Sequence, residues 1–290
     1  MTTFAQAAIT GLLLGGVYGL VAMGLSLVFG VMRVVNFAHG EFVLIGMYGT
    51  LALYTGLHLN PFVALLIIVP GALLLGAALQ QVLISRVTRT TDLRQLLLTL
   101  GLSLIIQSLA LIIFSPSQRS LPGFAWGSEL VRLGPIYVRP AHVVGFVIAV
   151  VVTGALALLL TRTDLGRAMR ATVDDAEMAE SSGVRTNRIY VVGMAIGVCI
   201  ACIAGAVLIT YYPASPNAGQ TFLVIAFVAV VLAGLGNVVG AFLGGLMAGL
   251  MQQFTASFIS VELQDVGLFA LFIAVLVLRP NGLFSRKQAA

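Results

Sequence analysis

The chain has 290 residues, of which 60% are hydrophobic and only 9% are charged, and its mean hydropathy is +1.09. In soluble domains about a quarter of all residues are charged, so this composition excludes a soluble domain and indicates an integral membrane protein. The net charge of +5 does not indicate nucleic-acid binding, because the basic residues flank apolar segments instead of forming one patch. The single lysine, Lys287, excludes a Walker A loop, which needs a lysine after its glycine-rich turn.

Apolar segments dominate the chain, and crossing the hydrocarbon core of a membrane takes roughly 20 apolar residues. Segments of about this length lie at 6–31, 38–57, 61–85, 95–114, 141–161, 189–211, 238–259 and 262–278. A shorter run at 221–235 is either a further span or a broken one. The sequence therefore predicts an all-α polytopic bundle of eight or nine transmembrane helices, some short or broken, in one permease domain over residues 1–290. No basic residue precedes the first segment, which favours an uncleaved span over a secretory signal.

Two segments carry glycine at every fourth position, a spacing that lets helix backbones approach closely. The first contains Gly11, Gly15 and Gly19, and the second contains Gly236, Gly240 and Gly244. Close helix packing accounts for both without a ligand. Cys199 and Cys202 have the spacing of a redox pair, but they lie within an apolar segment and are expected to be small packing residues.

A polar stretch, N-F-A-H-G-E at 36–41, opens the second apolar segment. One interpretation is an entry turn at the membrane surface, with its charged groups among the lipid headgroups. The other is that Asn36, His39 and Glu41 face the interior of the bundle, as ionisable groups within membranes usually do. Asn237 precedes a later apolar segment in a similar way, so these four residues are the candidates for the translocation path.

Residues 115–140 are predicted to form the one long outside loop, and they contain prolines and the only tryptophan, Trp126. A proline-rich loop with an aromatic residue suits either the docking of an external protein or anchoring at the membrane interface. We expect this loop to lie outside the membrane.

Residues 162–188 hold ten of the 25 charged residues (15 basic and 10 acidic), so this segment must lie in water. It is predicted to form a helix that Thr163 or Asp164 caps and Gly183 ends. Apolar or small residues recur on one face at helical spacing: Leu165, Ala168, Met169, Thr172, Val173, Ala176 and Ala179. A helix of this kind either lies on the membrane surface or on its own bundle, or docks a soluble partner.

The distribution of basic residues predicts the orientation. If the 162–188 loop is cytoplasmic, twelve basic residues fall on the cytoplasmic side and three, Arg119, Arg132 and Arg139, fall outside. This asymmetry fits the rule that cytoplasmic loops are rich in arginine and lysine. Nine crossings would then place the N-terminus outside and the C-terminus inside.

Four motifs resemble those of one family in the same order along the chain. They are N-F-A-H-G-E at 36–41, E-M-A-E-S-S-G at 177–183, V-L-A-G-L-G-N-V-V-G-A-F-L-G-G at 231–245 and L-R-P-N-G-L-F at 278–284. The chain thus resembles the H-type permease subunit of branched-chain amino acid ABC importers. The second motif is similar to the E-A-A-x-x-x-G coupling loop of such permeases, with Met178 in place of the first alanine.

The resemblance implies that the chain is half of a translocation path for branched-chain or other small amino acids. It implies a related M-type permease as heterodimer partner, two ATPase subunits that hydrolyse ATP, an external substrate-binding protein and a place in the bacterial plasma (inner) membrane. It also implies an ATPase-coupling role for the loop, with Leu165, Met169, Val173, Glu177, Ala179 and Gly183 as the candidate residues. Neither a cofactor nor a metal is expected, and the chain itself is not expected to be an enzyme.

The alternative is a self-contained secondary transporter or channel in which His39 and Glu41 form an ion site. A membrane-bound enzyme lacks support in the sequence, because no metal-ligand motif and no nucleophile motif is present.

Overall fold

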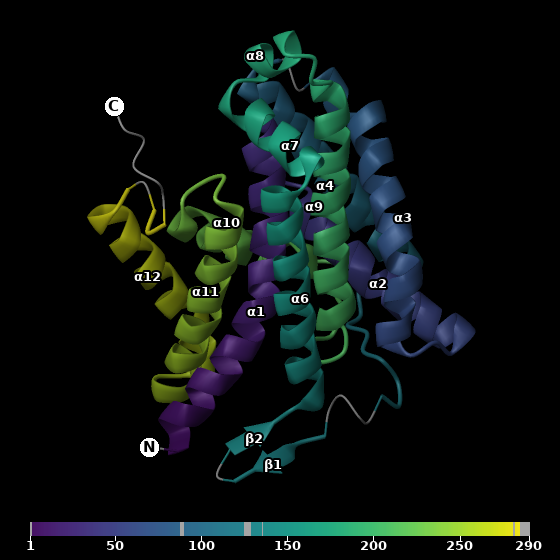
Figure 1. Ribbon diagram of the computed structural model, residues 1–290. Coiled ribbons are helices and arrows are strands. Elements are labelled where there is room, and N and C mark those ends of the chain that lie inside the picture. The colour runs from purple at the N-terminus through teal and green to yellow at the C-terminus, as the bar shows by residue number, and fades with distance from the viewer. Residues whose placement is uncertain (1, 88–89, 125–128, 135, 281, 285–290) are drawn as a thin grey trace.

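The computed structural model describes residues 2–87, 90–124, 129–134, 136–280 and 282–284. Trp126 therefore lies outside the described residues. Most of the described chain is helical, in a bundle whose long helices run roughly side by side (Figure 1). The helices and strands are α1 (Thr2–Met32), α2 (His39–Leu57), α3 (Pro61–Val82), η1 (Ile84–Arg86), α4 (Asp92–Phe114), β1 (Val131–Leu133), β2 (Ile136–Val138), α6 (Pro140–Arg162), α7 (Asp164–Asp174), α8 (Ala176–Ser181), α9 (Thr186–Leu208), α10 (Ala218–Ala233), α11 (Val238–Phe258), η2 (Val261–Leu263) and α12 (Gln264–Leu278).

The predicted all-α membrane fold is confirmed, but the number of spans differs from the prediction. Seven helices of the described chain are long and apolar enough to cross a membrane, rather than eight or nine. Two of the predicted segments, 38–57 and 221–235, form helices that are not among the seven. They are α2, which has 19 residues but opens with polar ones, and α10, which has only 16 residues. Both belong to the bundle, and both begin inside it.

The bundle has two distinct ends. At one end lie α7 and α8, the connection between α3 and α4, and the C-terminal segment, where the Leu283 N–H donates to the carbonyl of Leu232 (2.8 Å). At the other end an antiparallel hairpin pairs β1 with β2, and Gln6 near the N-terminus donates through Nε2 to the carbonyl of Tyr137 (2.7 Å). The described residues nearest the two termini therefore lie at opposite ends of the bundle, as an odd number of passes requires. We call these the α7–α8 end and the hairpin end.

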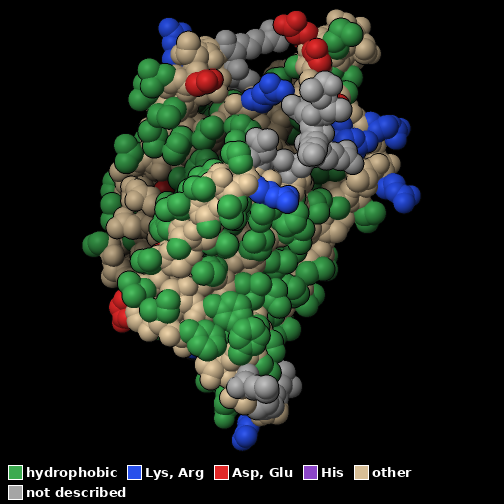
Figure 2. Space-filling model, turned by 90° about the vertical axis from the view of Figure 1, so that its left-hand side faces the viewer, with side chains coloured by type: hydrophobic (Ala, Val, Ile, Leu, Met, Phe, Trp, Pro, Cys, Tyr) green, Lys and Arg blue, Asp and Glu red, His purple; other side chains and the backbone are tan. Residues whose placement is uncertain are grey.

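Side-chain type follows the same division. On the face that Figure 2 shows, hydrophobic side chains dominate the middle of the molecule, and most charged side chains gather at the α7–α8 end. The exposed side chains of α3 and α6 are largely apolar, as in Leu66 (77% exposed) and Val151 (63% exposed). Such surfaces match the hydrocarbon of a bilayer, where exposed polar groups are costly.

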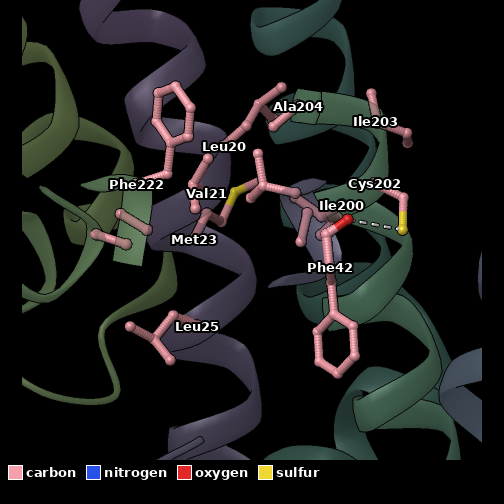
Figure 3. Packing of buried hydrophobic residues seen from close by; sticks show 14 of the residues in the cluster. Leu20, Val21, Met23, Leu25, Phe42, Ile200, Cys202, Ile203, Ala204 and Phe222 are labelled. Carbon is pink, nitrogen blue, oxygen red and sulfur yellow. Dashed lines mark hydrogen bonds between the residues drawn. The ribbon is translucent and has the colours of Figure 1, made fainter. Parts of the chain in front are cut away.

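The centre of the bundle is made by α1, α2, α9 and α10. Leu20, Phe42, Ile200 and Phe222 contribute to its apolar core (Figure 3). Cys202 Sγ donates to the carbonyl of Phe42 at 3.2 Å, and Cys199 Sγ faces the carbonyl of Val69 at 3.8 Å. The two cysteines are free, buried and bonded to different helices, which confirms that they are packing residues.

Helices α1 and α11 pack through their glycines. A Cβ atom on Gly15 would lie 2.8 Å from the Leu246 Cα, and one on Gly19 would lie 2.8 Å from the Phe242 carbonyl oxygen. The close packing predicted for the first glycine segment is thus confirmed. Of the second predicted series, Gly236 lies against Gly30 of α1 and Gly244 meets Ala229 of α10, while the closest contacts of α11 with α1 are made by Gly245 and Gly249.

Candidate functional site in the membrane and at helices α7 and α8

The polar stretch at 36–41 turns back into the bundle instead of lying at its surface. Asn36 and Glu41 are each 1% exposed, and His39 is 0% exposed. His39 Nε2 donates to the carbonyl of Val21 at 3.0 Å. Val21 precedes the end of α1 by eleven residues, which is about 16 Å along a helix. The interpretation of this stretch as an interfacial entry turn is therefore wrong, and α2 begins within the bundle.

Asn36 shapes the turn that allows this entry. Its Oδ1 accepts the Ala38 N–H at 3.0 Å, and its carbonyl accepts the His39 N–H at 3.2 Å. Its Nδ2 lies 3.9 Å from the sulfur of Met194. Since backbone groups in a membrane must be satisfied internally, an asparagine at this point is well suited to hold an irregular segment. Asn36 therefore stabilises the turn that leads into α2. The Glu41 carboxylate, a few residues further on, makes no comparable bonds to the turn.

Glu41 lies where two helices begin. Its Oε1 accepts a hydrogen bond from Ser103 Oγ of α4 at 3.1 Å, and its Oε2 has no partner among the described residues. The carboxylate packs on Gly219 in the first turn of α10, because a Cβ atom there would lie 2.5 Å from Oε2. Gly40 packs equally closely, since its Cβ would collide with the carbonyl oxygen of Gly219. The first turns of α2 and α10 thus meet around this carboxylate.

From this meeting point the two helices diverge. The far end of α2 reaches the hairpin end, where Tyr54 Oη donates to the carbonyl of Pro122 (3.0 Å). The far end of α10 reaches the α7–α8 end, where Gly234 contacts Gly282. Helices that start in the middle of a membrane direct their unpaired N–H groups and positive dipole ends at solute sites in many transporters.

Asn237, the fourth path candidate, is not part of this group. Its Oδ1 accepts the Gly240 N–H at 2.9 Å and caps α11, and its Nδ2 donates to the carbonyl of Phe284 at 2.8 Å. The bonds explain why an asparagine precedes this helix, since Asn is among the best N-cap residues. Sequence reasoning also missed Ser103 and Gly219. Ser103 and Gln107 lie four residues apart on one apolar span, a polar pair that could have signalled a functional face.

Residues 162–188 form two helices where one was predicted. Thr163 caps α7, as expected, because its Oγ1 accepts the Gly166 N–H at 3.0 Å. The helix ends at Asp174, and Asp175 then caps α8 by accepting the N–H groups of Glu177 (2.9 Å) and Met178 (3.0 Å). An aspartate competes with the helical backbone for hydrogen bonds, and this explains the break.

The end of the segment agrees with the prediction. Gly183 has a φ of +87°, a left-handed conformation that favours glycine. The Val184 N–H donates to the carbonyl of Ala179 at 3.0 Å, the bond expected after a left-handed helix end.

The apolar face of α7 and α8 packs on the bundle. Met169 is 1% exposed and Ala179 is 5% exposed, while Leu165 and Val173 are half-buried. The exposed side carries Arg167, Arg170, Asp174, Glu177 and Met178. Of the coupling candidates, Leu165, Met169, Val173 and Ala179 therefore hold the helices to the membrane domain, and Glu177 and Gly183 lie on the exposed side.

A cleft separates the α7–α8 junction from the end of α1. It has a volume of ≈ 440 Å³ and is lined by Arg33, Thr172, Asp175, Glu177 and Tyr190, among others.

Replacing Asp175 with alanine is expected to loosen α8. The change removes the two capping bonds, and the loss of such a cap costs about 1 kcal/mol. Hydrogen exchange at the amides of Glu177, Met178 and Ala179 should become roughly fivefold faster, the factor that corresponds to 1 kcal/mol. Asp174→Ala is the matched control, because Asp174 is exposed and does not cap α8. Equal exchange in both variants would contradict the capping role.

Comparison with known proteins decides the family. The model of the family described as branched-chain amino acid transport system, permease component, matches residues 7–276. The chain belongs to this permease family. The branched-chain amino acid permease BraD of Pseudomonas aeruginosa is 30% identical over 98% of this chain and 97% of its own length. LivH of Escherichia coli K12, described as a high-affinity branched-chain amino acid permease, is 29% identical over 98% and 96%.

A shorter match reaches a permease with a different described solute. LsrC of Escherichia coli, a permease of an autoinducer 2 import system, is 30% identical over 40% of this chain and 36% of its own length. No solved structure matches. The chain is accordingly a permease component of a transport system and a multi-pass protein of the plasma (inner) membrane, as the sequence predicted.

Proposed function

We propose that this permease carries branched-chain or other small amino acids inward as one half of a binding-protein-dependent ABC importer. The observation that carries the proposal is the full-length similarity to BraD and LivH, whose described solutes are branched-chain amino acids. The match to LsrC leaves other small solutes as the second candidate class, but it covers only 40% of the chain.

ATP hydrolysis in this proposal takes place on two separate ATPase subunits that bind the exposed side of α7 and α8. Met178 is 66% exposed and is flanked by the exposed acid Glu177. An apolar side chain rimmed by charges suits a protein contact. Because the opposite face of the same helices is anchored in the bundle through Met169 and Ala179, a displacement of α7 and α8 would reach α6 and α9.

The hairpin end is the proposed contact for an external substrate-binding protein. Leu130, Val131 and Tyr137 are between 45% and 61% exposed there. A pocket of ≈ 390 Å³ lies beside the hairpin and is lined by residues that include Arg139, Tyr211 and Pro213. The second half of the path is assigned to a related M-type permease, which forms a heterodimer with this chain.

Co-purification tests this assembly. A C-terminally tagged chain, solubilised gently from its native membrane, is expected to bring down a second permease of the same family and a P-loop ATPase. Transport by the chain alone, without either partner, would contradict the proposal. The alternative of a secondary transporter with His39 and Glu41 as its ion site would then be restored.

A further inference from the structure

One surface inside the membrane zone is polar. Asn217, Gln220 and Thr221 are exposed in the first turn of α10 and the residue that precedes it, and Gln107 of α4 is half-exposed beside them. Gln107 Nε2 donates to Asn217 Oδ1 at 2.8 Å, so the bond joins the two helices. We call these four residues the α10 polar face.

The depth of this face places it within the hydrocarbon zone. Gln107 precedes the end of α4 by seven residues, which is about 10 Å along a helix. The surfaces of α3 and α6 expose valine and leucine instead. Exposed amides are costly against lipid, where no water is available for hydrogen bonds. The α10 polar face therefore meets water or a polar partner and not acyl chains.

Directly behind this face lies the one carboxylate of the 36–41 stretch. Glu41 is 1% exposed, and its Oε2 has no partner among the described residues while it contacts Gly219. Gly219 contacts this oxygen, and the next residue, Gln220, is exposed on the polar face. The backbone of the first turn of α10 is therefore all that separates the oxygen from the polar face. A buried carboxylate with a vacant acceptor is costly unless a cation or a donor reaches it in some state of the protein.

An amino acid offers the complementary groups. Its ammonium group would pair with Glu41. Its carboxylate would accept from N–H groups in the first turn of α10 other than those of Ala218 and Gln220, which donate to the carbonyls of Ser215 (2.9 Å) and Asn217 (3.2 Å). Because Gly219 covers Glu41 in this conformation, pairing requires the first turn of α10 to move. Such a movement belongs to the alternation between states that transport requires.

We propose that the α10 polar face lines the water-filled part of the solute path and that Glu41 behind it binds the ammonium group of a zwitterionic solute. The inference rests on the proposed importer function for the nature of the solute. The accessibility of the face does not depend on that function, so the two can fail separately.

Cysteine labelling in the complete importer, in membranes, tests the polar face. Cys199 and Cys202 are first replaced by alanine, and Asn217→Cys and Gln220→Cys are then treated with a charged methanethiosulfonate. Ile105→Cys is the matched control, because Ile105 lies on α4 two residues from Gln107, on a different side of that helix, and is 60% exposed. Labelling at the two α10 positions is expected to be at least about tenfold faster than at Ile105→Cys, since only a thiolate in water reacts. Equal slow labelling would overturn the path assignment.

Uptake of radiolabelled leucine by the reconstituted importer tests Glu41. Glu41→Gln is expected to lower ATP-dependent uptake by at least about tenfold, the scale of losing one partner of a buried charge pair. Glu41→Asp should restore part of the uptake, and ATPase stimulation by the loaded binding protein should stay within twofold of the parent in both variants. Glu262→Gln, at an exposed position of η2, is the control.

The outcomes separate the two proposals. Normal uptake in Glu41→Gln overturns the ammonium site. A wild-type complex that shows no ATP-dependent uptake of leucine contradicts the proposed function instead. If the Glu41→Gln permease fails to assemble, the proposal is tested by leucine uptake in Glu41→Asp and by the labelling rate of Asn217→Cys. Absence of uptake in the first variant together with slow labelling in the second overturns the proposal.

Discussion

Gly15→Val is expected to prevent α1 and α11 from packing at their present distance. The new Cβ would lie 2.8 Å from the Leu246 Cα and 2.9 Å from the Gly245 carbonyl oxygen. These atoms belong to the backbone, so they cannot rotate aside and the helices must separate. Overpacking of a core costs about 1–3 kcal/mol, and a clash with rigid backbone lies at or above the upper end of this range. We expect a thermal midpoint at least about 5 °C below that of the parent protein in detergent.

Gly154→Val is the matched control for this experiment. Gly154 lies within a long apolar helix, α6, but apart from its chain neighbours and the adjacent backbone of α6, no heavy atom of the described chain comes within 4 Å of the position of its Cβ. Valine has the same helix propensity at both sites, so the difference between the variants isolates the contact between α1 and α11. A thermal midpoint that is equally lowered in both variants would show that valine, and not the contact, is responsible.

Met178→Asp is expected to abolish ATP-driven uptake while the membrane domain remains folded. Met178 is 66% exposed on α8, so an aspartate there stays in water and costs the fold little. It would, however, place a charge at the centre of the proposed ATPase contact, where a desolvated and unpaired charge is costly. Uptake should fall by at least about tenfold, the equivalent of 1.4 kcal/mol, and the ATPase should no longer co-purify.

The neighbouring residue provides the contrast. Ala179 is 5% exposed and faces the bundle, so Ala179→Asp would bury a charge between α8 and the membrane domain. This variant should lower the thermal midpoint of the purified permease, which Met178→Asp should leave unchanged. If Met178→Asp supports normal uptake, the ATPase does not bind this side of α8, and the proposed coupling contact is wrong.

Residues 162–188 show how much of the local structure the sequence could predict. Helical spacing predicted which residues share one apolar face, and the structure shows that this face packs on the bundle, where Met169 and Ala179 are buried. The sequence also limited the cap to Thr163 or Asp164, of which Thr163 is the cap, and placed the end at Gly183. It did not predict the break at Asp175, because two neighbouring aspartates fit either an exposed helical surface or a cap. Only the carbonyl and N–H positions of the folded chain decide between the two.

For the helices within the membrane, too, the sequence predicted the local features, and the tertiary structure decided which residues meet. Composition and apolar periodicity by themselves determined that the chain is a polytopic helical membrane protein, because lipid permits few alternatives for an apolar backbone. The four-residue glycine spacing of α1 determined that another helix packs closely on it. The tertiary structure alone decided that α11 is that helix, and that Glu41 meets Ser103 and Gly219 from helices far away in the chain. Such contacts depend on where α2 and α10 begin inside the bundle, and local sequence spacing carries no information about that depth.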